Sequence, residues 1–202
     1  TRLDCVVGSA ALLRHAFVQA LHHARHRVAF GRPLVEQPLM RAVLADIALE
    51  SEAATRLALR LAAARERMEE SPLERALWRI VTPAAKFWIC KRAIAVTAEC
   101  MEVLGGNGYV EDWPLARLYR EAPVNSIWEG SGNVVCLDML RGIAREPESA
   151  VALIDFLNAH AGANAVIAAA VREFVATLQL AREAREAEAR RKPVRYRVVV
   201  IQ

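Results

Sequence analysis

The 202-residue chain has few of the residues that mark several common protein classes. It contains 9 Gly, 6% aromatic residues and four scattered cysteines, without CxxC pairs or metal-ligand spacing. No uninterrupted apolar run approaches the roughly 20 residues that cross a bilayer, and no basic-then-apolar signal segment opens the chain. We therefore expect no membrane span, no bound metal, and small buried thiols in a reducing cytoplasm.

Lysine is also scarce, since nearly all of the 27 cationic residues are arginines. The planar guanidinium of Arg binds two phosphate oxygens at once, which suits a dinucleotide cofactor. The net charge of +4 is modest, and genome base composition explains the same Arg bias. The charge therefore does not by itself indicate a nucleic-acid partner.

The residues that are abundant, Ala, Leu, Arg and Glu, are strong helix formers. Long stretches with apolar residues at helical spacing alternate with short turns, which predicts an all-α fold of the antiparallel four-helix-bundle type. Pro83 is expected to kink or end the third helix, whose inward face is predicted to include Leu77, Ile80, Phe87 and Trp88. The predicted helices cover about residues 2–29, 37–67, 73–104, 112–121 and 134–144, with extra helices in 150–191.

Residues 124–141 contain the most informative stretch, Val-Asn-Ser-Ile-Trp-Glu-Gly-Ser-Gly-Asn followed by an apolar run. One carboxylate, Glu129, lies between the aromatic Trp128 and a flexible glycine-containing loop. Either Ser131 or Asn133 can cap the helix that follows. A carboxyl group in a dry pocket has a raised pKa and can act as a general base. An ordinary loop-to-helix joint with a solvated Glu explains the same spacing.

Two other stretches combine glycine with residues that suit a dinucleotide. Arg27-Val-Ala-Phe30-Gly ends the first predicted helix, where a guanidinium can meet two phosphate oxygens. Gly105 and Gly106 follow the third predicted helix, and paired glycines let the backbone turn sharply and approach a ligand. They do not form a Rossmann fingerprint, because the GxGxxG spacing is absent. For the first stretch the alternative is a solvent-facing Arg, and for the second it is a simple helix C-cap.

Taken together, these stretches resemble the acyl-CoA dehydrogenase family. Residues 128–131 are similar to its aromatic-Glu-Gly-Thr/Ser active-site loop, and residues 27–31 to its Arg-x-x-Phe-Gly element. Residues 102–109 are similar to its Gln-x-x-Gly-Gly-x-Gly-Tyr/Phe element, with Glu102 in place of Gln. The similarity covers about residues 1–145, and around Glu129 it is closest to the alkylation-response flavoprotein branch. It implies the C-terminal helical domain of an FAD-dependent dehydrogenase.

The resemblance also implies roles for individual residues. Glu129 would remove the α-proton of an acyl-CoA thioester as the β-hydrogen leaves as hydride to the flavin. Some branches place the base near the start of this domain, where Thr1 cannot serve, and this supports Glu129. Contacts with FAD are implied for Arg27, Phe30, Gly105, Gly106, Ser131 and Asn133, and contacts with the substrate for Arg2, Trp128 and Gly130.

The family further implies partners and a setting. We expect a homo-oligomer, a dimer or tetramer, in which Arg27 contacts the FAD diphosphate of a neighbouring subunit, and a role in cytoplasmic fatty acid metabolism. The chain lacks the glycine-rich, strand-rich part of the family fold. We therefore expect residues 1–202 alone not to turn over substrate.

Two other functions stay open. The branch resemblance and the basic residues between Arg190 and Arg197 allow a DNA-associated flavoprotein with little dehydrogenase activity. A structural bundle that mediates oligomerisation is compatible with either function. The domain division that we expect is 1–145 for the family domain and 146–202 for a helical extension with a charged tail. The strand-like stretch 194–202 receives no function.

Overall fold

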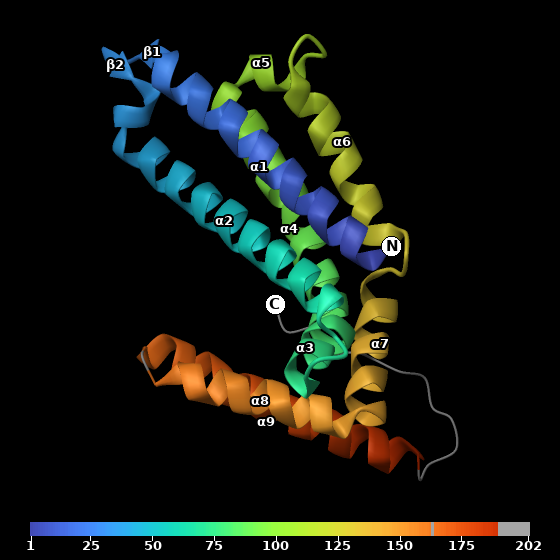
Figure 1. Ribbon diagram of the computed structural model, residues 1–202. Coiled ribbons are helices and arrows are strands. Elements are labelled where there is room, and N and C mark those ends of the chain that lie inside the picture. Colours follow the sequence, from blue (N-terminus) through green and yellow to red (C-terminus); the bar gives the residue numbers. More distant parts are fainter. Residues whose placement is uncertain (163, 190–202) are drawn as a thin grey trace. The chain divides into compact units, whose positions relative to one another are not determined.

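Helices make up nearly all of the computed structural model, which describes residues 1–162 and 164–189 (Figure 1). This confirms the all-α fold that the composition predicts. The chain divides into two compact units, residues 1–145 and 146–202. The first unit contains the helices α1 (Arg2–His26), α2 (Pro38–Glu66), α3 (Pro72–Ala76), α4 (Thr82–Leu104), α5 (Gly106–Tyr109), α6 (Pro114–Ile127) and α7 (Gly132–Arg145).

The helices α1, α2, α4 and α6 form an antiparallel bundle in which successive helices run in opposite directions (Figure 1). Two consequences of this order matter for the site. The ends of α1 and α4 lie at the same end of the bundle, because these two helices run in the same direction. The end of α6 returns to the beginning of α1, so residues more than 120 positions apart in the sequence meet there.

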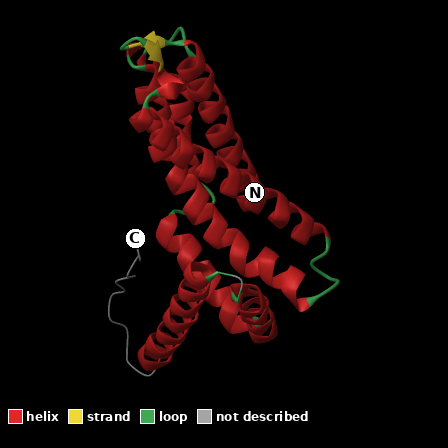
Figure 2. Cartoon of the chain, turned by 90° about the vertical axis from the view of Figure 1, so that its left-hand side faces the viewer, coloured by secondary structure: helices red, strands yellow, loops and turns green. Residues whose placement is uncertain are grey.

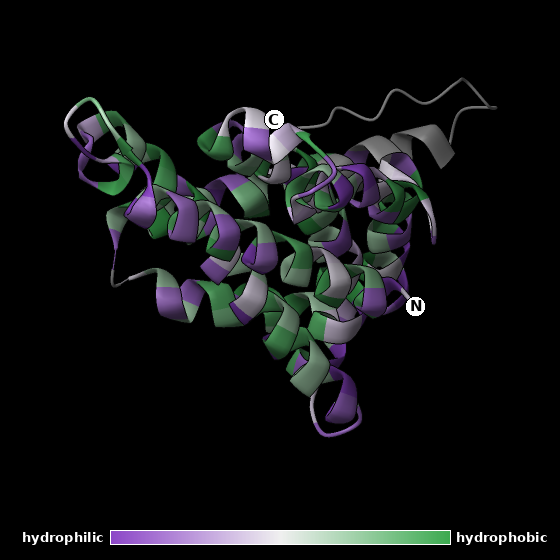
Figure 3. Ribbon diagram, turned by 90° about the horizontal axis from the view of Figure 1, so that it is seen from above, coloured by the Kyte–Doolittle hydropathy of each residue, from purple (hydrophilic) through white to green (hydrophobic). Residues whose placement is uncertain are grey.

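Small side chains allow the bundle helices to approach closely. Ala16, Ala20 and Ala24 recur every four residues on α1 and are fully buried, and α1 packs most extensively against α4. Ala85 and Ala93 are buried on α4. Hydrophobic and hydrophilic residues alternate along the helical ribbons (Figure 3). Such amphipathic helices bury the apolar side against one another, which is the main favourable contribution to folding.

A short hairpin follows α1, formed by the strands β1 (Val28–Ala29) and β2 (Arg32–Pro33), which pair antiparallel (Figure 2). Its two turn residues, Phe30 and Gly31, have φ angles of 56° and 82°. Two successive left-handed residues form the tight turn whose twist matches paired strands. The first helix was expected to reach residue 29 but ends at His26, because the hairpin takes the next residues. A short 3-10 helix, η1 (Leu34–Glu36), leads into α2.

The predicted disturbance at Pro83 is present and lies just before the proline. The π-helical segment η2 (Leu77–Val81) joins α3 to α4, and Pro83 occupies the first turn of α4. Proline has no N–H to donate, so the preceding turn cannot keep the regular hydrogen-bond ladder. The third helix predicted from the sequence is therefore divided into α3, η2 and α4.

The inward face predicted for the third helix is confirmed at Leu77 and Ile80, which are buried, but is wrong by about one residue at Phe87 and Trp88. Trp88 is 37% exposed, and Phe87 is only partly buried. The fully buried positions are instead Lys86, Ile89 and Cys90. Ala and other apolar residues occur all around α4, so periodicity alone does not identify the buried side. Lys86 lies on the core side, and because a lysine is usually exposed, the prediction placed the core side at the neighbouring Phe87 and Trp88 instead.

The second unit contains two helices, α8 (Pro147–Ala161) and α9 (Ala165–Ala189), which pack against each other. Asn164 begins α9 by accepting a hydrogen bond from the Val166 N–H through its side-chain oxygen, at 2.8 Å. The strand-like stretch 194–202 and the basic residues from Arg190 onward lie outside the described residues. Across 1–162 and 164–189, we find no helix with both the length and the apolar character of a membrane span.

Candidate active site

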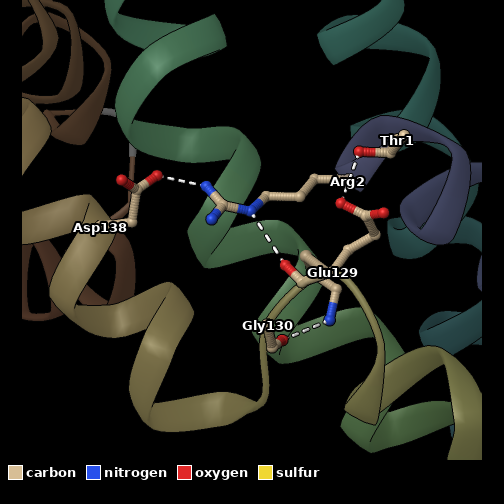
Figure 4. A network of polar contacts seen from close by, with 6 residues as sticks. Thr1, Arg2, Glu129, Gly130 and Asp138 are labelled. Carbon is tan, nitrogen blue, oxygen red and sulfur yellow. Dashed lines mark hydrogen bonds and ion pairs between the residues drawn. The ribbon is translucent and has the colours of Figure 1, made fainter.

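The return of α6 to the start of α1 brings the predicted base beside the first residues of the chain. The Thr1 hydroxyl donates a hydrogen bond of 2.7 Å to Oε2 of Glu129 (Figure 4). These are the two positions at which the family resemblance places a catalytic base. The fold therefore makes them neighbours in space, and here one carries the carboxylate while the other hydrogen-bonds to it.

Arg2 connects the loop that carries Glu129 to helix α7. Its Nε donates a hydrogen bond of 3.2 Å to the backbone oxygen of Glu129, and its guanidinium pairs with the Asp138 carboxylate (Figure 4). The side chains of Arg2 and Asp138 are 29% and 19% exposed, so solvent screens this pair only partly. Asp138 was not identified from the sequence, although a single acid within the apolar run 134–140 is a usable signal. These contacts hold the loop in place.

The backbone of the loop has an unusual conformation. Glu129 has a φ angle of 57° and Gly130 one of 104°, and a left-handed conformation is uncommon for any residue but glycine. A Cβ at position 130 would lie 3.0 Å from Cγ1 of Val134. The φ angle therefore favours glycine there, and a larger residue would also require the Val134 side chain to shift by a few tenths of an ångström. The Lys86 ammonium, from the buried face of α4, donates a hydrogen bond of 2.7 Å to the Gly130 oxygen.

The dry pocket expected around the base is not formed by residues 1–145 alone. The Glu129 side chain is exposed, and Trp128 is 54% exposed with its indole N–H donating to the Asn125 side-chain oxygen at 3.1 Å. In this unit the loop between α6 and α7 leaves the Glu129 side chain exposed. The site is thus an exposed carboxylate on a firmly held backbone, and any wall that excludes water must come from elsewhere.

Two cysteine thiols of the bundle core, Cys5 and Cys90, are buried. Burial raises the pKa of the Cys5 thiol, the Lys86 ammonium opposes this shift, and the Glu129 carboxylate adds to it. Burial likewise raises the pKa of Cys90, whose sulfur accepts a hydrogen bond of 3.3 Å from the Ser9 hydroxyl. These two cysteines are therefore inert core residues, as the sequence predicted, whereas Cys136 is only partly buried.

The residues implied for FAD contact fall into two groups. Phe30, at the hairpin tip, is 94% exposed, and Arg27 is exposed beside it. Gly105 and Gly106 lie exposed at the same end of the bundle, and Gly105 has a φ angle of 61° after the last turn of α4. This confirms its role as a helix stop.

The second group lies at the far end of α1. Ser131 and Asn133 are exposed beside Glu129 at the start of α7. Ser131 flanks the helix and its backbone oxygen accepts the Val135 N–H, whereas Asn133 lies within α7 and is not the cap. The 25 residues of α1 separate the groups by about 37 Å. The structure therefore does not bring all six residues together within one chain.

Comparison with known proteins gives a consistent result. The family model described as acyl-CoA dehydrogenase, C-terminal domain, matches residues 1–144. AidB of Escherichia coli (strain K12), a protein named for the acyl-CoA dehydrogenases, is 56% identical over 147 residues, which cover 72% of this chain and 27% of AidB. The acyl-CoA dehydrogenase family member 11 of Caenorhabditis elegans is 35% identical over 144 residues, 70% of this chain and 23% of that protein.

Solved structures agree on the fold. Bd2924 in its apo form has a TM-score of 0.81 at 31% identity, covering 94% of this chain and 37% of that one. The present chain spans about a quarter of the length of the two curated relatives. The helical fold, the family match over residues 1–144 and the identity to these relatives lead to one conclusion. This chain belongs to the acyl-CoA dehydrogenase family, and its residues 1–144 correspond to the C-terminal domain of that family.

Proposed function

We propose that the full-length protein is an FAD-dependent oxidoreductase that dehydrogenates an acyl-CoA thioester between its α- and β-carbons, with Glu129 as the base. The observation that carries the proposal is the presentation of Glu129. Its carboxylate is exposed, while Arg2 and Lys86 hold the backbone oxygens of Glu129 and Gly130. A carboxylate held in this way on the protein surface suits proton abstraction from a bound molecule.

The residues of this chain would handle the proton. Because the Thr1 hydroxyl donates to Oε2 of Glu129, Oε1 is the oxygen that we expect to accept the α-proton. The Trp128 ring, tied through its N–H to Asn125, would form one apolar wall of the substrate site. When bound, FAD accepts the hydride that leaves the β-carbon. Exclusion of water from the carboxylate is assigned to parts of the protein outside residues 1–145, since this unit leaves Glu129 exposed.

We further propose that FAD is shared between subunits of a homo-oligomer. The two groups implied for FAD contact lie at opposite ends of α1, about 37 Å apart. In this arrangement Ser131 and Asn133 would bind the FAD that serves their own Glu129. Arg27, Phe30 and the glycines after α4 would bind the FAD of a neighbouring subunit.

The test uses the absorption spectrum of bound flavin in the full-length protein. We expect one member of an acyl-CoA panel to bleach the flavin in the wild type, and Glu129→Gln to retain the flavin but to lose the bleaching, by roughly a hundredfold or more in rate. Bound flavin that no acyl-CoA reduces, or a Glu129→Gln variant that bleaches normally, would overturn the proposal. C11-CoA, which is bound in the structure of ACDH-11 from Caenorhabditis elegans, is a sensible first panel member.

A second candidate is a DNA-associated flavoprotein with little dehydrogenase activity, and the 56% identity with AidB is the observation that favours it. Its expected signature is duplex binding whose affinity falls steeply with added salt, because phosphate contacts release counterions. Flavin that stays oxidised with every acyl-CoA, together with salt-dependent duplex binding, would select this candidate. The absence of duplex binding at low salt would exclude it.

A further inference from the structure

Lys86 is the one lysine among the largest fully buried side chains of the described residues, with 1% of its surface exposed. It lies on the core face of α4, one turn before Ile89 and Cys90. Taking an ammonium out of water is costly unless a polar partner compensates, so lysines are rarely fully buried. The partner here is the Gly130 oxygen at 2.7 Å, directly after the proposed base.

The backbone that Lys86 holds is one that would not persist unsupported. Glu129 and Gly130 have φ angles of 57° and 104°, and a non-glycine residue in the left-handed region is held there only by its surroundings. Arg2 holds the Glu129 oxygen from α1, and Lys86 holds the Gly130 oxygen from α4. Two cations from two helices thus bind two successive carbonyl groups, which fixes the orientation of the peptide between them.

We propose that Lys86 is a positioning residue for Glu129, a proposal that rests on the proposed role of Glu129 as the base. By binding the Gly130 oxygen, Lys86 keeps residues 129 and 130 left-handed and so sets the direction of the Glu129 side chain. Lys86 does not touch the substrate in this assignment, and it acts only through the loop. The charge matters because an ammonium binds a carbonyl oxygen more strongly than a neutral donor does.

The geometry also predicts which contacts a substitution of Lys86 would remove and which it would keep. Methionine matches the length of the lysine stem and is itself a common core residue, so Lys86→Met keeps the packing of α4 and removes only the donor. The Gly130 oxygen would then turn towards water, and the loop between α6 and α7 would relax from its left-handed conformation. The bundle helices would keep their contacts.

The first experiment is hydrogen–deuterium exchange on the full-length protein, followed by mass spectrometry of peptides. In Lys86→Met we expect amides of residues 128–133 to exchange about tenfold faster or more, since a charge-assisted hydrogen bond changes a local opening equilibrium by roughly that factor. Peptides from α1 and α2 should be unchanged. Arg41→Met is the control for the loss of one cation, because Arg41 is exposed near the start of α2, and it should leave the loop unchanged.

The second experiment separates positioning from general folding. In the flavin-reduction assay, Lys86→Met should lower the maximal rate about a hundredfold with little change in the substrate concentration at half-maximal rate, because misplacement of a reacting group acts on the chemical step. Lys86→Arg keeps a donor and should recover part of the loss. If Lys86→Met does not fold, the same comparison is made with Lys86→Gln, whose shorter amide cannot place a charge at Gly130.

The outcomes are distinct from those of the function test. A folded Lys86→Met protein whose loop exchanges like the wild type would overturn the positioning role, whatever its activity. A loop that exchanges faster while flavin reduction keeps its wild-type rate would also overturn it. If no acyl-CoA reduces the wild-type flavin, the proposed function fails, whereas the exchange result still decides whether Lys86 holds the loop.

Discussion

The substitution Gly108→Ala tests whether the turn after α4 is as tightly packed as the structure shows. A Cβ at this position would lie 2.8 Å from Cα and 2.9 Å from the carbonyl carbon of Met101, and closer still to the Met101 oxygen. These are backbone atoms of α4, so no side-chain rotation relieves the clash. Gly108 is buried, and α5 packs against both α4 and α6.

The magnitude follows from the geometry. Ordinary carbon contacts are about 3.5–4.0 Å, so α5 would have to move by roughly 1 Å away from α4. Overpacking of this kind costs about 1–3 kcal/mol. For a unit of this size each kcal/mol lowers the melting temperature by about 2–4 °C, so we expect a decrease of about 2–12 °C.

Thermal melting followed by circular dichroism at 222 nm is the assay, and Gly106→Ala is its control. Nothing lies within 4 Å of a Cβ at Gly106, which also lies in α5 and does not share the positive φ of Gly105. Alanine there reduces the freedom of the unfolded chain, so we expect no loss and a gain of up to about 1 kcal/mol. A Gly108→Ala protein that melts within about 1 °C of the wild type would refute the packing that we describe.

Three further predictions concern ion pairs and a thiol. The Arg60 guanidinium donates hydrogen bonds of 2.8 and 2.7 Å to Glu74 and thereby lowers its pKa from 4.5. The stability that comes from this lowered pKa is present above pH 4.5 and is lost as the pH falls through the folded-state pKa. Urea unfolding should therefore show that the wild type is more stable than Glu74→Gln by about 1 kcal/mol at pH 7, and that this difference vanishes in acid. A difference that persists in acid would contradict the prediction. A double-mutant cycle with Arg2→Gln and Asp138→Asn should give a coupling free energy of about 1 kcal/mol, and zero coupling would argue against the pair. Burial raises the pKa of Cys100 to about 12, so a thiol reagent at pH 8 should modify it only after unfolding, as peptide mass mapping can check.

Much of the fold and of the candidate site could be predicted from local sequence. The excess of Ala and Leu favours helices wherever they occur in the chain, and the helix-breaking signals at Pro83 and Gly105 act within a few residues of themselves. The loop around Glu129 was identified for the same reason, since the base, the glycines and the aromatic residue are contiguous. The hairpin after His26 was missed, because the residues before Phe30 have no strong preference against continuing the helix.

The sequence by itself determined what depends on neighbours along the chain: the helices, their turns, and the short segments whose order marks the family. The tertiary structure alone decided what depends on distant partners. It placed Thr1 and Arg2 against Glu129, paired Arg2 with Asp138, and turned Lys86 rather than Trp88 into the core. Helical periodicity gives each helix an apolar side but does not say which helix will cover it. A buried lysine becomes favourable only once the fold supplies the carbonyl oxygen that it binds.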